Sequence, residues 1–131
     1  MNTILVAAAV IERDGSFLVT RRLEGTHLAG AWEFPGGKCD AGEPLEACLW
    51  REIREELGVR CRVGEEIFRI THDYPDRQIE LHFFSCALEG EPAPQLGQDM
   101  LWVSRDGLAD LQFPPADDAV IEKLLRSHGP V

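Results

Sequence analysis

Several features are scarce in this chain of 131 residues, and each scarcity excludes a class of protein. Basic residues number 13 against 23 acidic ones, and the net charge of −10 is opposite to what a nucleic-acid polymer attracts. No apolar run approaches the roughly 18 residues of a membrane-spanning helix, so we expect no membrane partner. The apolar start of the chain lacks basic residues and runs into Glu12-Arg13-Asp14-Gly15, which predicts a strand and a turn instead of a signal peptide.

Cysteine is scarce as well, and its spacing is uninformative. Cys39, Cys48, Cys61 and Cys86 form no CxxC pair, so neither a zinc site nor a redox motif is indicated. We expect reduced thiols in a cytoplasmic protein, most of them filling space in the core. The length and the apolar fraction of 44% predict one globular domain over residues 1–131, as a monomer or homodimer.

The order of apolar and turn-forming residues predicts a strand-rich chain with two helices. Strands are expected at 4–11, 17–20, 32–34, 61–71, 78–88 and 101–103, and helices at 44–57 and 117–127. The strand at 78–88 alternates, with Ile79, Leu81 and Phe83 on one face and Glu80 and His82 on the other. Strands with helices on both sides predict an α/β fold, an α/β/α sandwich with a mixed central sheet.

The most informative pattern lies between residues 37 and 59. A glycine, a glutamate and an Arg-Glu-Ile-x-Glu-Glu-x-Gly-Val segment follow one another at fixed spacing, with Gly37, Glu43, Arg51, Glu52, Glu55, Glu56 and Gly58 as the fixed positions. On a helix, Glu52, Glu55 and Glu56 fall within an arc of roughly 100°. Carboxylates this close repel one another unless a cation neutralises them, and their hard oxygens suit Mg²⁺ or Mn²⁺.

A solvated acidic face is the alternative interpretation of these glutamates. It is disfavoured because Leu45, Cys48 and Leu49 project in nearly the same directions as Glu52 and Glu56. The acidic patch therefore borders the buried face of the helix. Paired glycines at Gly36-Gly37 also let the backbone approach a ligand closely, which an ordinary turn pair would not need.

These positions match the Nudix box throughout, so the chain resembles the Nudix hydrolases. The resemblance implies an α/β/α sandwich and metal-dependent hydrolysis of a diphosphate linkage. The metal ligands it implies are Gly36, Gly37, Glu43, Glu52, Glu55 and Glu56, with Mg²⁺ as cofactor and Mn²⁺ as a substitute. It favours Glu52 as the general base, Glu56 or Glu55 as the principal ligand, and Arg51 as the residue that orients carboxylates. Glu43 is either a ligand or an orienting group.

Outside the box the chain resembles MutT-type members, which hydrolyse oxidised purine nucleoside triphosphates such as 8-oxo-dGTP to the monophosphate and pyrophosphate. The matching segments are Thr20-Arg21-Arg22, His27-Leu28, Trp32-Glu33-Phe34-Pro35-Gly36-Gly37-Lys38, Tyr74-Pro75-Asp76-Arg77 and Phe113-Pro114-Pro115-Ala116. This resemblance implies that Arg22 and His27 contact phosphates. The backbone around Phe34 and the side chain of Asp117 would read the base. Lys38 and Arg77 supply further cations near the motif.

Asp117 stands where the MutT pattern has Asn. A protonated Asp regains the donor that an ionised one lacks, and the neighbouring Asp118 could help retain that proton if both are sheltered. The alternative is that Asp117 is only the N-cap of the last helix. The sequence leaves both readings open.

Two further alternatives concern the substrate. Near Leu96 relatives tend to carry a Glu that joins the metal site, and the nearest acid here is Asp99. This neighbourhood and the segment 11–15 also resemble the CTP/dCTP pyrophosphohydrolase branch. A non-catalytic nucleotide-sensing module is a third possibility, although such modules usually lose box carboxylates and none is missing here.

Overall fold

The computed structural model describes residues 3–26 and 28–127. Seven strands form one mixed sheet in the order β3-β2-β1-β6-β5, with β4 paired to β1 and β7 paired to β2. The strands are β1 (Thr3–Arg13), β2 (Ser16–Arg21), β3 (Trp32–Glu33), β4 (Gly36–Lys38), β5 (Arg60–Tyr74), β6 (Arg77–Glu89) and β7 (Met100–Ser104). β1 and β6 run parallel, and the other pairs are antiparallel.

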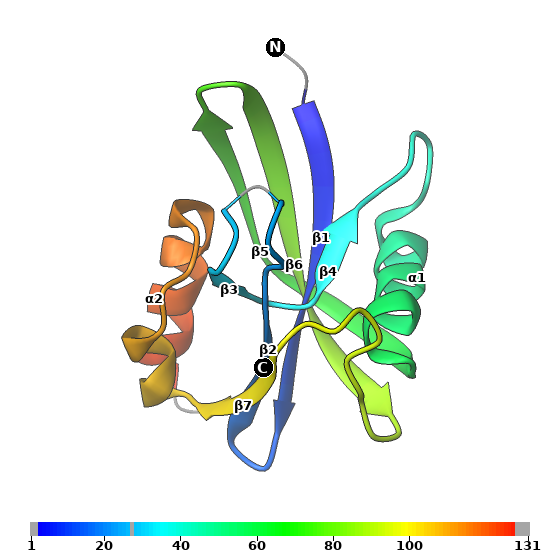
Figure 1. Cartoon of the computed structure of the whole chain (residues 1–131), viewed down its shortest axis with the longest axis vertical. Helices are drawn as coiled ribbons and strands as arrows, with labels where there is room; N and C mark the ends of the chain where they lie inside the picture. The colour runs from blue at the N-terminus through cyan, green and yellow to red at the C-terminus, as the bar shows by residue number, and fades with distance from the viewer. Residues whose placement is uncertain (1–2, 27, 128–131) are drawn as a thin grey trace.

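The helices lie on opposite sides of this sheet (Figure 1). They are α1 (Leu45–Leu57) and α2 (Asp118–Arg126), and the short 3₁₀ helices η1 (Asp106–Asp110) and η2 (Pro115–Asp117) precede α2. Along β1, Ala7 and Ala9 pack in the core cluster that contains α1, whereas Ala8 and Val10 pack in the cluster that contains α2. Successive side chains of a strand point to opposite faces, so both faces of β1 are buried. The predicted α/β/α sandwich with a mixed sheet is confirmed.

β1 exchanges partners along its length, and this exchange shapes the site. On one edge it pairs with β4 at residues 6–8 and with β2 only at Glu12 and Arg13, while β6 follows its other edge. No strand was predicted at residues 36–38. β4 forms there because the two glycines let its backbone lie beside that of β1.

All the other predicted strands and both helices are present, with bounds that differ by a few residues. His82 lies on the opposite face of β6 from Leu81 and Phe83, as predicted, but this face is buried too. Its ring contacts the carboxylates of Glu66 and Glu80 on the α1 side of the sheet. Within residues 3–26 and 28–127, none of the helices has the length and hydropathy of a membrane span.

The prediction of reduced thiols is wrong for two cysteines. Cys39 and Cys48 form a disulfide, whereas Cys61 and Cys86 are free and buried as expected. The bond forms because β4 ends beside the first turns of α1, which brings the two Cα atoms within 5.2 Å. A separation of nine residues without a recognised motif gave no sign of this proximity.

Candidate active site

Helix α1 presents its carboxylates because of how it begins, ends and docks. Pro44 precedes the first turn in an extended conformation, and Gly58 ends the helix in the left-handed conformation, where its N–H donates to the Arg54 carbonyl. The buried side chains of α1 are Cys48, Leu49, Ile53, Glu56 and Leu57. Glu52 and Glu56 therefore emerge at the border of the docked face, and Glu55 lies further out toward solvent.

The three helix glutamates line one cavity of about 250 Å³, called here the acidic pocket. Its lining also includes Thr20, Arg21, Arg22, Leu23, Thr26, Glu33, Gly36, Leu96 and Gln98. The structure thus brings Glu52, Glu55 and Glu56 together with a fourth carboxylate, Glu33 of β3. Glu33 was not among the predicted site residues.

Glu56 is the most unusual carboxylate of the pocket. Its residue is only 8% exposed, and burial, reinforced by the negative charges of Glu33 and Glu52, raises its pKa to about 9. One hydrogen bond with the Gly36 backbone opposes that rise, but Oε2 is buried without a hydrogen-bond partner among the described residues. A buried oxygen of this kind costs stability unless a ligand satisfies it.

The donor set of the pocket fits a divalent cation. Burial also raises the pKa of Glu33 and of Glu52, although hydrogen bonds from Arg22 and Arg51 oppose the rise. Crowded carboxylates with raised pKa values are the arrangement that a cation would stabilise in ionised form. The orphaned Oε2 of Glu56 supplies an oxygen ligand of the type that Mg²⁺ and Mn²⁺ prefer.

Arg51 connects four groups around the pocket. Its Nε and Nη2 donate to the two oxygens of Glu43 at 2.9 Å each, and Nη1 donates to Glu52 at 2.9 Å and to Glu55 at 3.5 Å. Nη2 also reaches the Lys38 carbonyl at 3.2 Å. Bidentate pairing of this kind fixes the rotamers of the carboxylates.

Glu43 belongs to this network more than to the pocket. Hydrogen bonds from Arg51 and from the Asp40 N–H lower its pKa to about 2. The residues that line the acidic pocket do not include Glu43. Glu43 is therefore connected to the carboxylates of the acidic pocket through Arg51.

Gly36 and Gly37 have no side chains, and neighbouring atoms lie where a Cβ would stand on either residue. A Cβ on Gly36 would collide with the Ala7 carbonyl oxygen of β1. A Cβ on Gly37 would come within 2.5 Å of the Glu52 carboxylate. Only glycine therefore lets β4 pass between β1 and Glu52.

A second cavity, called here the apolar cavity, adjoins the acidic pocket. Its volume is about 280 Å³, and β1, β4, β6 and the segment leading into α2 line it. Five predicted substrate-binding residues meet here: Arg22, Phe34, Lys38, Arg77 and Asp117. Three residues line both cavities, namely Arg22, Glu33 and Gly36. The sixth predicted residue, His27, lies outside the described residues.

Asp117 is a buried acid at the end of the apolar cavity. It is 5% exposed, and burial, followed by the charges of Glu33 and Asp118, raises its pKa to about 8. Asp117 occupies the N-cap position of α2, but its side chain makes no capping hydrogen bond, so capping does not account for the burial of its carboxyl group. Asp118 is exposed, which means that burial of Asp117 and not mutual shelter of the pair dominates its protonation.

An ion pair stands where the two cavities meet. Arg22 Nη1 donates to Glu33 Oε1 at 2.8 Å, and both side chains are about one-quarter exposed. Sequence reasoning selected Arg22 but missed Glu33, although the Trp-Glu-Phe-Pro-Gly-Gly-Lys segment contained it. A lone acid in a short apolar strand is the signal that would have identified it.

The segment before β7 closes the acidic pocket without an acid. Leu96 and Gln98 line it, and the buried Gln98 side chain donates to the Glu56 carbonyl at 3.0 Å. The Asp99 carboxylate lies 3.7 Å from Arg21 Nη1 and is absent from the lining of the acidic pocket. Asp99 therefore pairs with Arg21 and does not line the acidic pocket.

Comparisons with known proteins agree on one family. The NUDIX domain family model matches residues 6–123. The 8-oxo-dGTP diphosphatase of Haemophilus influenzae is 41% identical, over 93% of this chain and 91% of that protein. The CTP pyrophosphohydrolase of Escherichia coli is 35% identical, over 95% of this chain and 93% of that protein. The solution structure of the Escherichia coli ORF135 protein matches with a TM-score of 0.82 at 36% identity, covering 93% of this chain and 88% of that one.

Proposed function

Because this chain belongs to the Nudix family, in which it is a MutT-like hydrolase, we propose that it converts nucleoside triphosphates to nucleoside monophosphates and pyrophosphate, with 8-oxo-dGTP preferred. Such a reaction would sanitise the nucleotide pool and so avoid mutation. One observation carries the proposal: a pocket of four carboxylates opens into an apolar cavity that ends in a buried, protonatable Asp117. The first suits a metal and a phosphate chain, and the second suits a base.

The acidic pocket is the proposed metal site, with Mg²⁺ as cofactor and Mn²⁺ as a substitute. Glu52, Glu55 and Glu56 would hold the ion, together with the backbone carbonyl of Gly36, which also lines the pocket, and that of Gly37, which abuts the Glu52 carboxylate. When bound, the ion would offset the charge of the phosphate chain and polarise the attacked phosphorus. Glu43 would act through Arg51, which holds Glu52 in place.

The remaining steps fall to side chains of the chain itself. Glu52 is the proposed general base, because Arg51 fixes its carboxylate at the edge of the pocket. Arg22 lines both cavities and would offset phosphate charge, whereas Lys38 and Arg77 line the apolar cavity alone and would contact the substrate there. Arg22 stands where both cavities meet, which suits the phosphate nearest the nucleoside.

Base recognition is assigned to Phe34 and Asp117. A carboxylic acid with a pKa near 8 is mostly protonated at neutral pH, so Asp117 can donate one hydrogen bond and accept another. That matches the edge of an oxidised purine, where a carbonyl and an N–H lie side by side. Phe34 packs against Phe113 with ring centroids 5.4 Å apart and helps to form the apolar wall.

A CTP/dCTP pyrophosphohydrolase is the second candidate. The 35% identity to the Escherichia coli CTP pyrophosphohydrolase over 95% of this chain favours it. A nucleotide-sensing module without turnover is the third. It is disfavoured because Glu52, Glu55 and Glu56 all remain and line one pocket.

A screen of substrates separates these candidates. With Mg²⁺ present, we expect hydrolysis of 8-oxo-dGTP to the monophosphate and pyrophosphate, at a kcat/KM at least about tenfold above that for dGTP or CTP. The screen would follow pyrophosphate release over oxidised and normal triphosphates, dinucleoside polyphosphates and nucleotide sugars. Preference for CTP or dCTP would transfer the protein to the second candidate, and tight binding without turnover would support the sensor.

Replacing Asp117 tests base recognition directly. Asp117→Ala should lower kcat/KM for 8-oxo-dGTP by about 5- to 150-fold, since loss of a base hydrogen bond of about 1–3 kcal/mol removes that much discrimination. The rate for dGTP should change less, so the measured quantity is the ratio of the two kcat/KM values. The matched control is Asp118→Ala, because Asp118 is adjacent but exposed.

The same residue predicts a pH dependence. Since the raised pKa keeps Asp117 protonated up to about pH 8, the preference should hold at lower pH and weaken as pH rises through that value. Asp117→Asn keeps a donor and an acceptor without titrating, and its preference should stay flat from about pH 6 to about pH 9. An unchanged ratio in Asp117→Ala would remove Asp117 from base recognition.

A further inference from the structure

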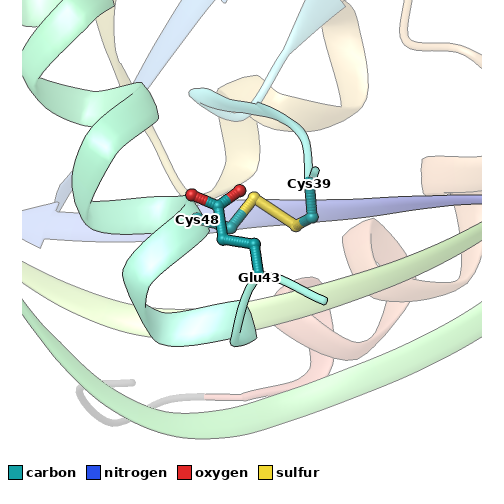
Figure 2. Close-up of side chains that lie close together, drawn as sticks. All are labelled: Cys39, Glu43 and Cys48. Carbon is teal, nitrogen blue, oxygen red and sulfur yellow. A yellow bond between two sulfur atoms is a disulfide. The ribbon is translucent and has the colours of Figure 1, made fainter. Parts of the chain in front are cut away.

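The disulfide between Cys39 and Cys48 ties together the two walls of the acidic pocket. Cys39 directly follows β4, and its N–H donates to the Leu5 carbonyl at 2.9 Å. Cys48 lies on α1 one turn before Glu52. Figure 2 shows the bond joining the end of the strand to the start of the helix, with the Glu43 side chain beside it. The linkage therefore closes the loop that contains Glu43.

The bond is in direct contact with the part of β4 that faces the carboxylates. Cys48 Sγ lies 3.8 Å from the Gly37 carbonyl oxygen, and Gly37 abuts the Glu52 carboxylate. Arg51 is the other side chain of α1 that holds this region, through its hydrogen bond to the Lys38 carbonyl. If the disulfide opens, the spacing between Gly37 and Glu52 depends on that hydrogen bond and on the pairing of β4 with β1.

The two sulfurs differ in accessibility and environment. Cys39 is partly exposed, whereas Cys48 is fully buried, so an incoming thiolate reaches the Cys39 side. Cys48 would then be the leaving group; its position in the first turn of α1 favours a thiolate there, while its burial opposes one. A carboxylate oxygen of Glu43 lies within 4.8 Å of both sulfurs and opposes this, but its charge is already paired with Arg51.

We propose that Cys39–Cys48 is a reversible thiol–disulfide exchange site, and that the oxidised state holds a divalent cation in the acidic pocket more tightly than the reduced state. The second clause rests on the metal site of the proposed function. A disulfide can be reversible and redox-sensing, and this pair joins β4 to α1, which both contribute residues to the acidic pocket. The hydrolase would thus bind its cofactor best under the oxidising conditions that damage nucleotides.

The exchange balances with a dithiol as reductant. Its thiolate attacks Cys39 Sγ, the S–S bond breaks, and Cys48 leaves as a thiolate that takes up a proton. The second thiol of the reductant, losing its proton, then attacks the mixed disulfide and releases Cys39, which is protonated in turn. Two electrons pass to the protein and the dithiol becomes a disulfide. A low-molecular-weight disulfide such as oxidised glutathione reverses the exchange.

The test measures thiols, stability and metal binding without any nucleotide. The folded protein is treated with dithiothreitol or with oxidised glutathione and alkylated after unfolding, and its mass is measured. We expect two alkylated cysteines in the oxidised sample, Cys61 and Cys86, and four after reduction. The melting temperature should fall by roughly 5–10 °C on reduction, because the closed loop no longer restricts the unfolded chain.

Mn²⁺ titration followed by electron paramagnetic resonance tests whether the oxidised protein binds the cation more tightly. Reduction of the disulfide should weaken the Mn²⁺ affinity roughly tenfold. In Cys39→Ser and in Cys48→Ala, reduction should change neither the melting temperature nor the Mn²⁺ affinity. In the control Cys61→Ala, reduction should still lower both. Four alkylated cysteines after oxidation, or reduction that requires unfolding, would overturn the exchange site. Equal Mn²⁺ affinity in both states would overturn the coupling to the metal. Because no hydrolysis is measured, a wrong substrate assignment leaves these results unaffected.

Discussion

Replacing Glu56 by Gln is expected to lower kcat by about three orders of magnitude with the fold intact. The amide keeps the volume of the side chain and its hydrogen-bonding ability, but it removes the charge that would hold the cation. The orphaned Oε2 of Glu56 is the atom placed for this role. Initial rates at saturating Mg²⁺, with circular dichroism as a check on folding, measure the effect.

The stability of the metal-free variant provides an internal check. The pKa of Glu56 is raised from 4.5 to about 9, so ionisation disfavours the folded state and stability is lost as pH rises between these two values. The amide side chain of Glu56→Gln cannot ionise, so the variant should melt at a higher temperature than the parent protein at about pH 8 without metal. The matched control is Glu46→Gln on the exposed first turn of α1, which should leave kcat within about twofold. Activity of Glu56→Gln near that of the parent protein would contradict the role of Glu56 as a ligand.

Adding one methyl group at Gly37 should lower kcat by about two orders of magnitude. The new Cβ would stand within 2.5 Å of the Glu52 carboxylate, so that carboxylate must move away from β4. Displacement of a general base by about 1 Å is enough for a loss of this size. The melting temperature should change little, because the atoms that must shift are the end of one flexible side chain.

Gly15→Ala is the matched control for this substitution. Gly15 has a φ of 80° in the turn between β1 and β2, and nothing lies within 4 Å of a Cβ placed there. The control should lose roughly 1 kcal/mol of stability from backbone strain and keep its turnover. If Gly37→Ala instead behaves like Gly15→Ala, losing stability while hydrolysing normally, Glu52 is not the base.

The sequence predicted those parts of the site whose geometry is local. Glu52, Glu55 and Glu56 share one helix, so helical spacing alone placed them together. The resemblance to known enzymes added Arg22, Phe34 and Asp117, and closeness to the motif added the cations Lys38 and Arg77. All five line one cavity. Their roles in binding and catalysis stay predictions.

The parts that could not be predicted depend on contacts between distant segments. Glu33 joins the acidic pocket only because β3 pairs with β2 and brings it beside Arg22 and α1. The disulfide depends on β4 lying next to β1, a pairing of three residues that carries no periodicity. Burial of Asp117, which decides its protonation, depends equally on how η2 closes over the sheet.

The two cavities share only three of the described residues that line them, and this near-separation has a consequence for evolution. The acidic pocket takes its carboxylates from α1 and β3, whereas most of the apolar cavity comes from β1, β6 and the chain before α2. Mutations that reshape the base-binding wall therefore fall on elements other than α1. A lineage can exchange one nucleobase for another while the hydrolytic machinery is inherited unchanged. Such separable inheritance is compatible with relatives of 41% and 35% identity whose names specify a purine in one case and a pyrimidine in the other.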